Sequence, residues 1–307
     1  MKVLLASSSD VSIPVLDYLH NSTEIELLAV ITNPDKATGR GQEMAANKVA
    51  QWCTEFGVAV EKPSSHEELL KCVERGKPDL LITVAYGHIL KEAVINLPKF
   101  GAINLHYSLL PAYRGAAPVQ WAILNGEKTT GVSVFKLDSG MDTGPIYLQR
   151  SVEIEQNDTT SNLLSKLNIV GVELIKETLK LIAAGVSPAS QSKNGISFAP
   201  KFTKIDGAVD WHKSAEEIFN KYRALSDNPG VFTTYIGSKV RLNQIAMVDI
   251  VIAALSPGVF SNIEGNLIVG TGKGALLISS LTPEGRKVMS GIDFYNGLQD
   301  KKVDHFG

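Results

Sequence analysis

Cysteine is scarce in this chain. Only Cys53 and Cys72 occur among 307 residues, and neither lies in a cluster with the spacing of metal ligands. Two thiols cannot cross-link a chain of this length, so a disulfide scaffold and a cysteine-rich metal site are both excluded. A reducing compartment, the cytoplasm, is the expected location.

Long apolar runs are missing as well. No stretch of 18 apolar residues exists, so no membrane-spanning helix is predicted. The N-terminus carries one lysine, Lys2, and an apolar run too short for a signal peptide. A protein that does not associate with membranes is expected.

A large excess of charge of one sign is also lacking. The net charge of −2 argues against non-specific binding of polyanions. Residues 1–187 hold 17 Lys and Arg against 21 Asp and Glu, a charge of −4, whereas residues 188–307 hold 13 against 11, a charge of +2. The second part is faintly basic, which alone is weak support for a nucleic-acid partner.

Two nucleotide-binding motifs are absent. The first apolar segment, residues 2–6, leads into Ser7-Ser8-Ser9-Asp10 and not into Gly-x-Gly-x-x-Gly. A Gly-Lys-Ser/Thr phosphate loop is absent too. A dinucleotide site and a nucleoside-triphosphate site are therefore disfavoured.

What the first 187 residues do contain is an alternation of strands and helices. Buried-strand patterns fall at residues 2–6, 25–31, 58–60, 80–85, 101–106, 130–136 and 146–152. Helical patterns fall between them, near residues 14–20, 47–56, 65–74, 118–126 and 160–184. This order predicts an α/β fold with a doubly wound, mostly parallel, Rossmann-like sheet.

The pattern changes after residue 187. A segment rich in Ser, Pro and Gly, residues 185–195, is typical of a linker. Beyond it, one helix near residues 216–225 is followed by short strands separated by glycine turns, which predicts a small antiparallel, OB-like β-barrel. We therefore expect a catalytic domain at 1–187, a linker at 188–205 and a β-barrel domain at 206–307.

Polar side chains gather where the predicted strands end. Asn104 and His106 are two positions apart on one strand, so they point to the same face at its carboxyl end. The segment 85–87 and the loop 138–144, which contains Asp142, end at the same edge, where ligands of open α/β sheets bind. An amide and an imidazole there suit the stabilisation of developing negative charge. An isolated Asn-x-His is more often a turn cap and a satisfied core histidine.

Three motifs at their mutual spacing are more specific: Asn104-x-His106, Ser108-Leu109-Leu110-Pro111-x-Tyr113-Arg114-Gly115, and Asp138-x-Gly140-x-Asp142-x-Gly144. On these motifs the chain resembles the folate-dependent formyltransferases. The likeness continues end to end, in Ser12-x-Pro14-x-Leu16, Gly39-Arg40-Gly41, Ala199-Pro200-Lys201, Asp210-Trp211 and Arg223-Ala224-Leu225.

The resemblance implies transfer of a formyl group from 10-formyltetrahydrofolate to the α-amino group of methionine on initiator methionyl-tRNA. It implies that Asn104 and a protonated His106 donate hydrogen bonds to the reacting oxygen. It implies that Asp142 orients His106, raises its pKa and is a candidate to help remove the amine proton. No covalent enzyme intermediate, no metal and no obligate protein partner are expected.

The resemblance also implies two binding sites. Residues of the folate site are expected to be Ser108, Leu109, Leu110, Pro111, Tyr86 and Gly87. Arg40 is expected to contact tRNA from a glycine-bearing loop, although Gln42 and Glu43 follow it where lysines are common in the family. The β-barrel domain is expected to bind tRNA as well.

Three other functions fit the same residues. The acceptor could be a smaller amine, on a sugar nucleotide or on glycinamide ribonucleotide. Water could be the acceptor, with formate released from the folate. A folate- or tRNA-binding module without turnover is the third, and the presence of all three candidate catalytic groups disfavours it.

Overall fold

The computed structural model describes residues 1–38, 42–248, 255–298 and 304–307. The chain forms two compact units, each assembled from several segments. The first comprises Met1–Pro118, Thr129–Glu153 and Leu164–Pro200, and the second comprises Val119–Lys128, Ile154–Leu163 and Lys201–Gly307. The expected domain limits of 1–187 and 206–307 stay a prediction. The second unit includes residues 119–128 and 154–163, which lie within the first expected domain.

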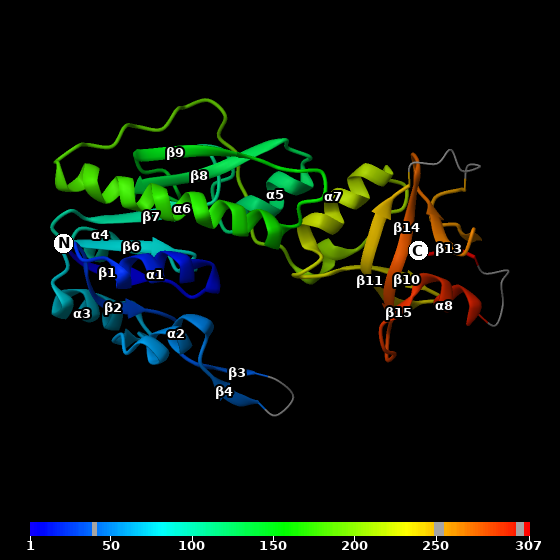
Figure 1. Cartoon of the computed structure of the whole chain (residues 1–307), viewed down its shortest axis with the longest axis horizontal. Helices are drawn as coiled ribbons and strands as arrows, with labels where there is room; N and C mark the ends of the chain where they lie inside the picture. Colours follow the sequence, from blue (N-terminus) through cyan, green and yellow to red (C-terminus); the bar gives the residue numbers. More distant parts are fainter. Residues whose placement is uncertain (39–41, 249–254, 299–303) are drawn as a thin grey trace. The chain divides into compact units, whose positions relative to one another are not determined.

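A seven-stranded sheet forms the first unit (Figure 1), with the strand order β5-β2-β1-β6-β7-β8-β9. Its strands are β1 (Lys2–Ala6), β2 (Glu26–Ile31), β5 (Val60–Glu61), β6 (Leu80–Val84), β7 (Ala102–His106), β8 (Thr129–Lys136) and β9 (Ile146–Glu153). The pairings from β5 to β7 are parallel, and β8 and β9 are antiparallel to their neighbours. The predicted α/β class with a mostly parallel sheet is confirmed.

Helices connect the parallel strands. They are α1 (Ile13–Asn21), α2 (Lys48–Phe56), α3 (His66–Gly76) and the short α4 (Glu92–Ile95), and the long α6 (Thr160–Ala183) follows β9. Polar side chains set two of the starts: Asn47 accepts a hydrogen bond from the Ala50 N–H, and Ser65 accepts one from the Glu68 N–H. Such caps satisfy N–H groups that a helix cannot pair internally.

Helices pack on both faces of this sheet. The side chains of each strand alternate between the two faces. On one face Leu4, Leu81 and Ala102 share a register and pack in a buried cluster with residues of α3 and α4. Leu105 points to the other face, where it lies against Gly171 of α6. Residues 104 and 106 therefore lie on the same side as Ala102.

A hairpin occupies the segment expected to be an irregular loop. Strands β3 (Lys36–Thr38) and β4 (Glu43–Ala45) pair antiparallel as a separate two-stranded sheet. Their three-residue length gives too little alternation for a sequence pattern to indicate a strand. Arg40, expected to contact tRNA, lies outside the described residues.

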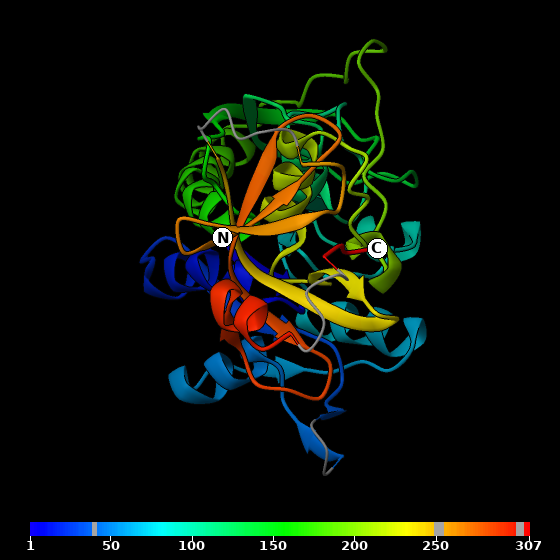
Figure 2. The same cartoon turned by 90° about the vertical axis from the view of Figure 1, so that its right-hand side faces the viewer.

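An antiparallel sheet forms the second unit (Figure 2), with the order β10-β11-β14-β13-β12 and β15 paired with β14. Its strands are β10 (Val231–Tyr235), β11 (Ser238–Met247), β12 (Phe260–Ile263), β13 (Asn266–Gly270), β14 (Ala275–Pro283) and β15 (Met289–Ser290). Its helices include most of α5 (Pro118–Leu124), all of α7 (Ala215–Leu225) and all of α8 (Gly291–Asn296). The antiparallel β character is confirmed, and closure into a barrel stays a prediction.

Aromatic rings fill the core of the second unit. The rings of Phe260 and Phe306 lie 4.6 Å apart, and those of Tyr235 and Phe294 lie 5.3 Å apart. Trp211, which is 4% exposed, stacks on Phe306 and donates a hydrogen bond through its indole N–H to Thr233. Trp211, one of the residues that carry the resemblance, is therefore part of the core of the second unit.

Among the described residues, no helix has the length and apolar character needed to cross a membrane.

Candidate active site

The side chain of Asn104 lies near the carboxyl end of β7, and a neighbouring strand orients it. Its amide nitrogen donates a hydrogen bond of 2.8 Å to the hydroxyl of Thr83, its register partner on β6. That hydroxyl in turn donates to the carbonyl oxygen of Ile103 at 3.1 Å. A carboxamide carries two N–H donors, and this contact uses one of the two donors of Asn104.

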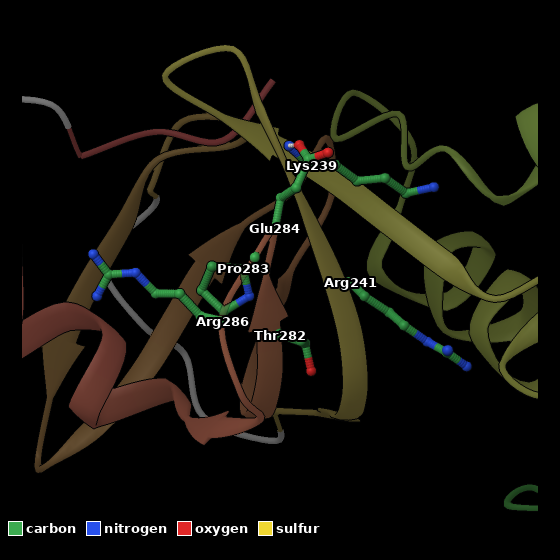
Figure 3. Close-up of a pocket in the computed structure, with 7 residues that line it drawn as sticks. Lys239, Arg241, Thr282, Pro283, Glu284 and Arg286 are labelled. Carbon is green, nitrogen blue, oxygen red and sulfur yellow. Dashed lines mark hydrogen bonds between the residues drawn. The ribbon is translucent and has the colours of Figure 1, made fainter. Parts of the chain in front are cut away.

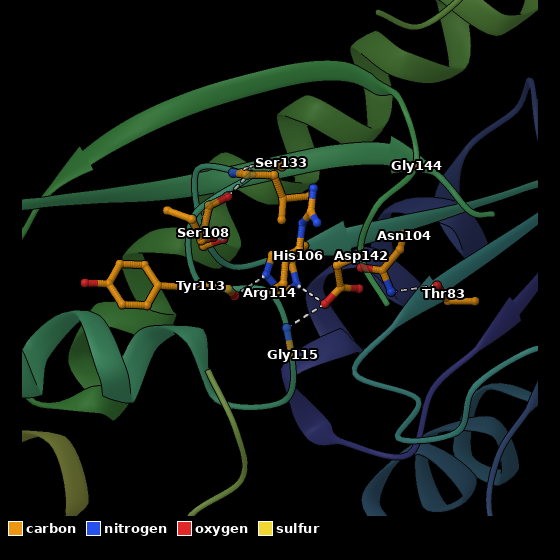
Figure 4. Close-up of polar contacts among 12 residues, drawn as sticks. Thr83, Asn104, His106, Ser108, Tyr113, Arg114, Gly115, Ser133, Asp142 and Gly144 are labelled. Carbon is orange, nitrogen blue, oxygen red and sulfur yellow. Dashed lines mark hydrogen bonds and ion pairs between the residues drawn. The ribbon is translucent and has the colours of Figure 1, made fainter. Parts of the chain in front are cut away.

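His106 is buried between two partners that come from different loops (Figure 4). Its side chain is 7% exposed, its Nε2 lies 2.9 Å from the carbonyl oxygen of Tyr113, and its Nδ1 lies 3.8 Å from Oδ2 of Asp142. A carbonyl oxygen only accepts hydrogen bonds, so Nε2 carries the proton. In the neutral imidazole Nδ1 is then the basic nitrogen, and it faces the carboxylate.

A main-chain N–H group holds the Asp142 carboxylate. Oδ2 accepts a hydrogen bond of 2.7 Å from the Gly115 N–H, and the residue itself has a φ of 53°. Gly115 has a φ of 122°, and a Cβ there would lie 2.8 Å from the carbonyl oxygen of Ala199. Glycine is therefore required at 115, because any side chain would move the N–H that holds the carboxylate.

Burial lowers the pKa of His106 below its ordinary value, against the opposing effects of the Asp142 charge and the Tyr113 carbonyl. The Asp142 charge raises the pKa of His106, as expected, but the net shift is downward. Desolvation disfavours the charged form, and here it outweighs both favourable neighbours. A lowered pKa favours the neutral imidazole, whereas the family resemblance implies a protonated donor.

The segment expected to line the folate site is held by Ser133, a fully buried residue of β8. Its hydroxyl donates to the Ser108 carbonyl oxygen at 2.5 Å, and it accepts from the Leu110 N–H at 3.1 Å and from Gln149 Nε2 at 2.8 Å. Gln149 also donates to the Leu110 carbonyl oxygen at 2.9 Å. One hydroxyl thus uses its donor and both of its acceptor sites.

Two further features shape this segment. The peptide bond between Leu110 and Pro111 is cis. The side chain of Leu109 occupies the space where a Cβ on Gly131 of β8 would lie, 2.8 Å from its Cγ. Ser108, Leu109, Leu110 and Pro111 therefore have a defined backbone, and their contact with folate stays a prediction.

Tyr86 and Gly87 follow β6 at the same edge of the sheet. The Tyr86 side chain is 6% exposed in the core cluster with Leu90 and Val94, and burial raises its pKa to about 12. Gly87 is exposed with a φ of 79°. Their role in the folate site stays a prediction. Because the Tyr86 ring belongs to the core, this prediction concerns the main chain of the two residues.

A groove in the second unit gathers basic residues (Figure 3). Lys239, Arg241 and the turn from Thr282 to Arg286 line it, with Glu284 as the one acidic side chain. The side chains of Lys239, Arg241 and Arg286 extend in different directions. Lys and Arg are the residue types that neutralise nucleic-acid phosphates.

Sequence reasoning missed several residues that orient the site, among them Thr83, Ser133 and Gln149. Thr83 sits inside a predicted strand, and only the register of β6 against β7 brings it to Asn104. Ser133 and Gln149 are likewise register partners on β8 and β9. Alternation within one strand identifies faces, but it carries no signal for which residues pair across strands.

Comparison with known proteins assigns the class. The Formyl transferase family matches residues 1–179, and the Formyl transferase, C-terminal domain family matches residues 201–299. Together with the mixed sheet and the Asn104, His106 and Asp142 cluster, these matches define a formyl transferase.

Full-length relatives narrow the class. The methionyl-tRNA formyltransferase of Thermodesulfovibrio yellowstonii is 36% identical over 99% of this chain and 98% of its own length. That of Streptomyces griseus is 37% identical over 97% of each chain. The chain belongs to the methionyl-tRNA formyltransferase family.

Solved structures share the fold at lower identity. The N-formyltransferase from Helicobacter canadensis, in complex with folinic acid and dTDP-3-aminofucose, superposes with a TM-score of 0.68 at 20% identity, over 91% of this chain and 98% of that one. HypX from Aquifex aeolicus superposes with a TM-score of 0.69 at 18% identity, over 97% of this chain and 49% of that one.

Proposed function

We propose that the chain transfers a formyl group from 10-formyltetrahydrofolate to the α-amino group of methionine on initiator methionyl-tRNA. The proposal depends mainly on one observation: the chain is 36% identical to a methionyl-tRNA formyltransferase over nearly its full length, and it matches both family domains. The convergence of Asn104, His106 and Asp142 at one strand end supports it, because these groups suit formyl transfer to an amine.

The proton transfers of the reaction give His106 and Asp142 distinct roles. The amine nitrogen bonds to the formyl carbon, the bond from that carbon to N10 of the folate breaks, and the proton lost by the amine ends on N10. The basic Nδ1 of His106 takes up that proton, where it lies beside the Asp142 carboxylate, and then returns it. Asp142 thus favours the charged imidazole at the moment it forms.

Asn104 is the donor to the reacting oxygen. Thr83 uses one of its two amide N–H groups, which leaves the other for the oxygen that gains negative charge as the amine attacks. His106 Nε2 is occupied by the Tyr113 carbonyl and takes no part in this contact. A donor oriented before the reaction stabilises the developing charge without a reorganisation cost.

The folate donor and the tRNA are expected to bind through different parts of the chain. Solved relatives of the same fold have been crystallised with folate derivatives, including HypX with tetrahydrofolic acid. We assign the folate to the segment Ser108–Pro111 and to the main chain at 86–87. We assign tRNA phosphates to the groove around Arg241 and Arg286, and tRNA contact to Arg40.

A transfer assay tests the proposal. The purified chain, 10-formyltetrahydrofolate and methionyl-initiator tRNA should yield formylmethionyl-tRNA, and Asp142→Asn should remove most of that turnover. Parallel reactions with a dTDP-amino sugar, and with no amine, measure the two competing acceptors. Preferential formylation of the sugar amine, or fast formate release without an amine, would overturn the assignment of substrate.

A further inference from the structure

A segment expected to be a plain linker reaches the candidate active site. Gln191 lies in the stretch rich in Ser and Gly that follows α6, and its Nε2 donates to the carbonyl oxygens of Asp142 and Gly144, at 2.8 Å each. Its Oε1 accepts a hydrogen bond of 2.6 Å from the guanidinium of Arg114. One carboxamide therefore uses both N–H donors and its acceptor.

Arg114 determines which way this carboxamide points. Arg114 is 9% exposed, and a guanidinium can only donate, so the oxygen of Gln191 must face it and the amide nitrogen must face the two carbonyl groups. A reversed amide would bring donors against donors and acceptors against acceptors. The orientation of Gln191 is therefore dictated by its surroundings.

The same segment also holds the other partner of His106. Ser197 accepts a hydrogen bond from the Tyr113 N–H through its hydroxyl at 2.8 Å, and its carbonyl oxygen accepts from the Arg114 N–H at 2.9 Å. Ala199 donates to the Arg114 carbonyl oxygen at 2.7 Å. Tyr113 supplies the carbonyl oxygen that binds Nε2 of His106, so residues 191–199 contact the neighbours of the imidazole on both sides.

Asp142 needs such support because its backbone is in the left-handed region, with a φ of 53°. Residues other than glycine persist there only when surrounding contacts hold them. The carboxylate contacts the Gly115 N–H, whereas Gln191 holds the main chain of the same residue. Without Gln191 the loop could relax and carry the carboxylate away from Nδ1 of His106.

We propose that Gln191 is a positioning residue of the formyl-transfer centre, which sets the place of the Asp142 carboxylate relative to His106 by binding the main chain at 142 and 144. The proposal rests on the proposed function for its kinetic consequence. Its geometric consequence, the distance between carboxylate and imidazole, is independent of the substrate.

Gln191→Glu tests the N–H donors of the carboxamide separately from its oxygen acceptor. It keeps an acceptor for Arg114 and replaces the two N–H donors by an oxygen that repels both carbonyl groups. We expect a 10- to 100-fold fall in kcat, on the order of the cost of a small misplacement of a catalytic group. The KM values for folate and tRNA should change by about twofold or less, because Gln191 touches neither binding segment.

The matched control is Gln51→Glu, the same chemical change at an exposed glutamine whose Nε2 donates to the Ala46 carbonyl oxygen at 2.8 Å. The second readout is the NMR titration of the His106 ring in Gln191→Met, which removes the carboxamide without adding a charge. The midpoint should fall as the Asp142 carboxylate moves away, and it should not change in Gln51→Met. Thermal unfolding of each variant separates loss of fold from loss of position.

The outcomes are distinct. A wild-type kcat in folded Gln191→Glu, together with a wild-type His106 midpoint in folded Gln191→Met, would overturn the positioning role. A lower midpoint in a protein whose wild type formylates no methionyl-tRNA would uphold the positioning role and sink the proposed substrate.

Discussion

At the scale of single residues, the state of His106 decides the chemistry. Its two nitrogens have different partners, the Tyr113 carbonyl at Nε2 and the Asp142 carboxylate facing Nδ1. The first contact determines the tautomer, and the second stabilises a proton when one arrives. Burial lowers the pKa of the imidazole and favours its neutral form, which suits the proposed role of His106 as a base.

Asn104→Ala should lower kcat/KM by about 10² to 10³, the usual cost of removing one donor to a developing negative charge. The KM for folate should stay near that of the wild type. Thr83→Val, which removes only the group that orients the amide, should cause a smaller loss in the same steady-state assay. Equal losses in the two variants would show that Asn104 acts through the strand pairing and not on the substrate.

Asp142→Asn should lower the titration midpoint of His106, since the carboxylate is a cause that raises its pKa. NMR titration of the His106 ring in the wild type and the variant measures this. The unfolded chain binds the His106 proton at the ordinary pKa of about 6.5, so stability falls as pH drops below that value. A midpoint that rises in the variant would contradict this account of the pair.

At the scale of elements, pairs of strands and loops hold the site. Ser133 on β8 satisfies the main chain of the segment 108–110, and residues 191–199 brace the loops that carry Tyr113 and Asp142. Each contact joins residues far apart in the sequence. Disruption of an orienting element should therefore affect binding or turnover without touching a reacting group.

Ser133→Ala should destabilise the fold by about 1–3 kcal/mol, because it leaves the buried Leu110 N–H without its acceptor. It should also weaken folate binding, since the segment 108–111 loses its anchor. Urea unfolding and folate titration measure the two effects. Ser151→Ala, on the exposed part of β9, is the control and should change neither; unchanged folate affinity in Ser133→Ala would remove this segment from the folate site.

At the scale of the whole molecule, the chain divides its tasks. The first unit holds the candidate catalytic groups, and the second holds the basic groove. The net charge of −2 gives no general attraction to nucleic acid, so the proposed phosphate binding depends on local groups such as Arg241 and Arg286.

Arg286→Ala should weaken tRNA binding and reduce the slope of log affinity against log salt by about 1, the value for one lost phosphate contact. Filter binding or fluorescence titration over a range of salt concentrations measures this. Arg150→Ala is the control, since Arg150 is an exposed arginine of the first unit paired with Glu177. A slope that does not change in Arg286→Ala would remove this groove from the tRNA contact.

The sequence by itself determined the α/β class, most strand and helix positions and the three motifs that indicate formyl transfer, because hydrophobic periodicity and local motifs are encoded within short segments. Only the tertiary structure decided the burial that lowers the pKa of His106, the support of Asn104 by Thr83 and the contact of Gln191 with Asp142. Those depend on burial and on pairing between distant segments. Local pattern carries no measure of either, because desolvation and strand register exist only once the chain has folded.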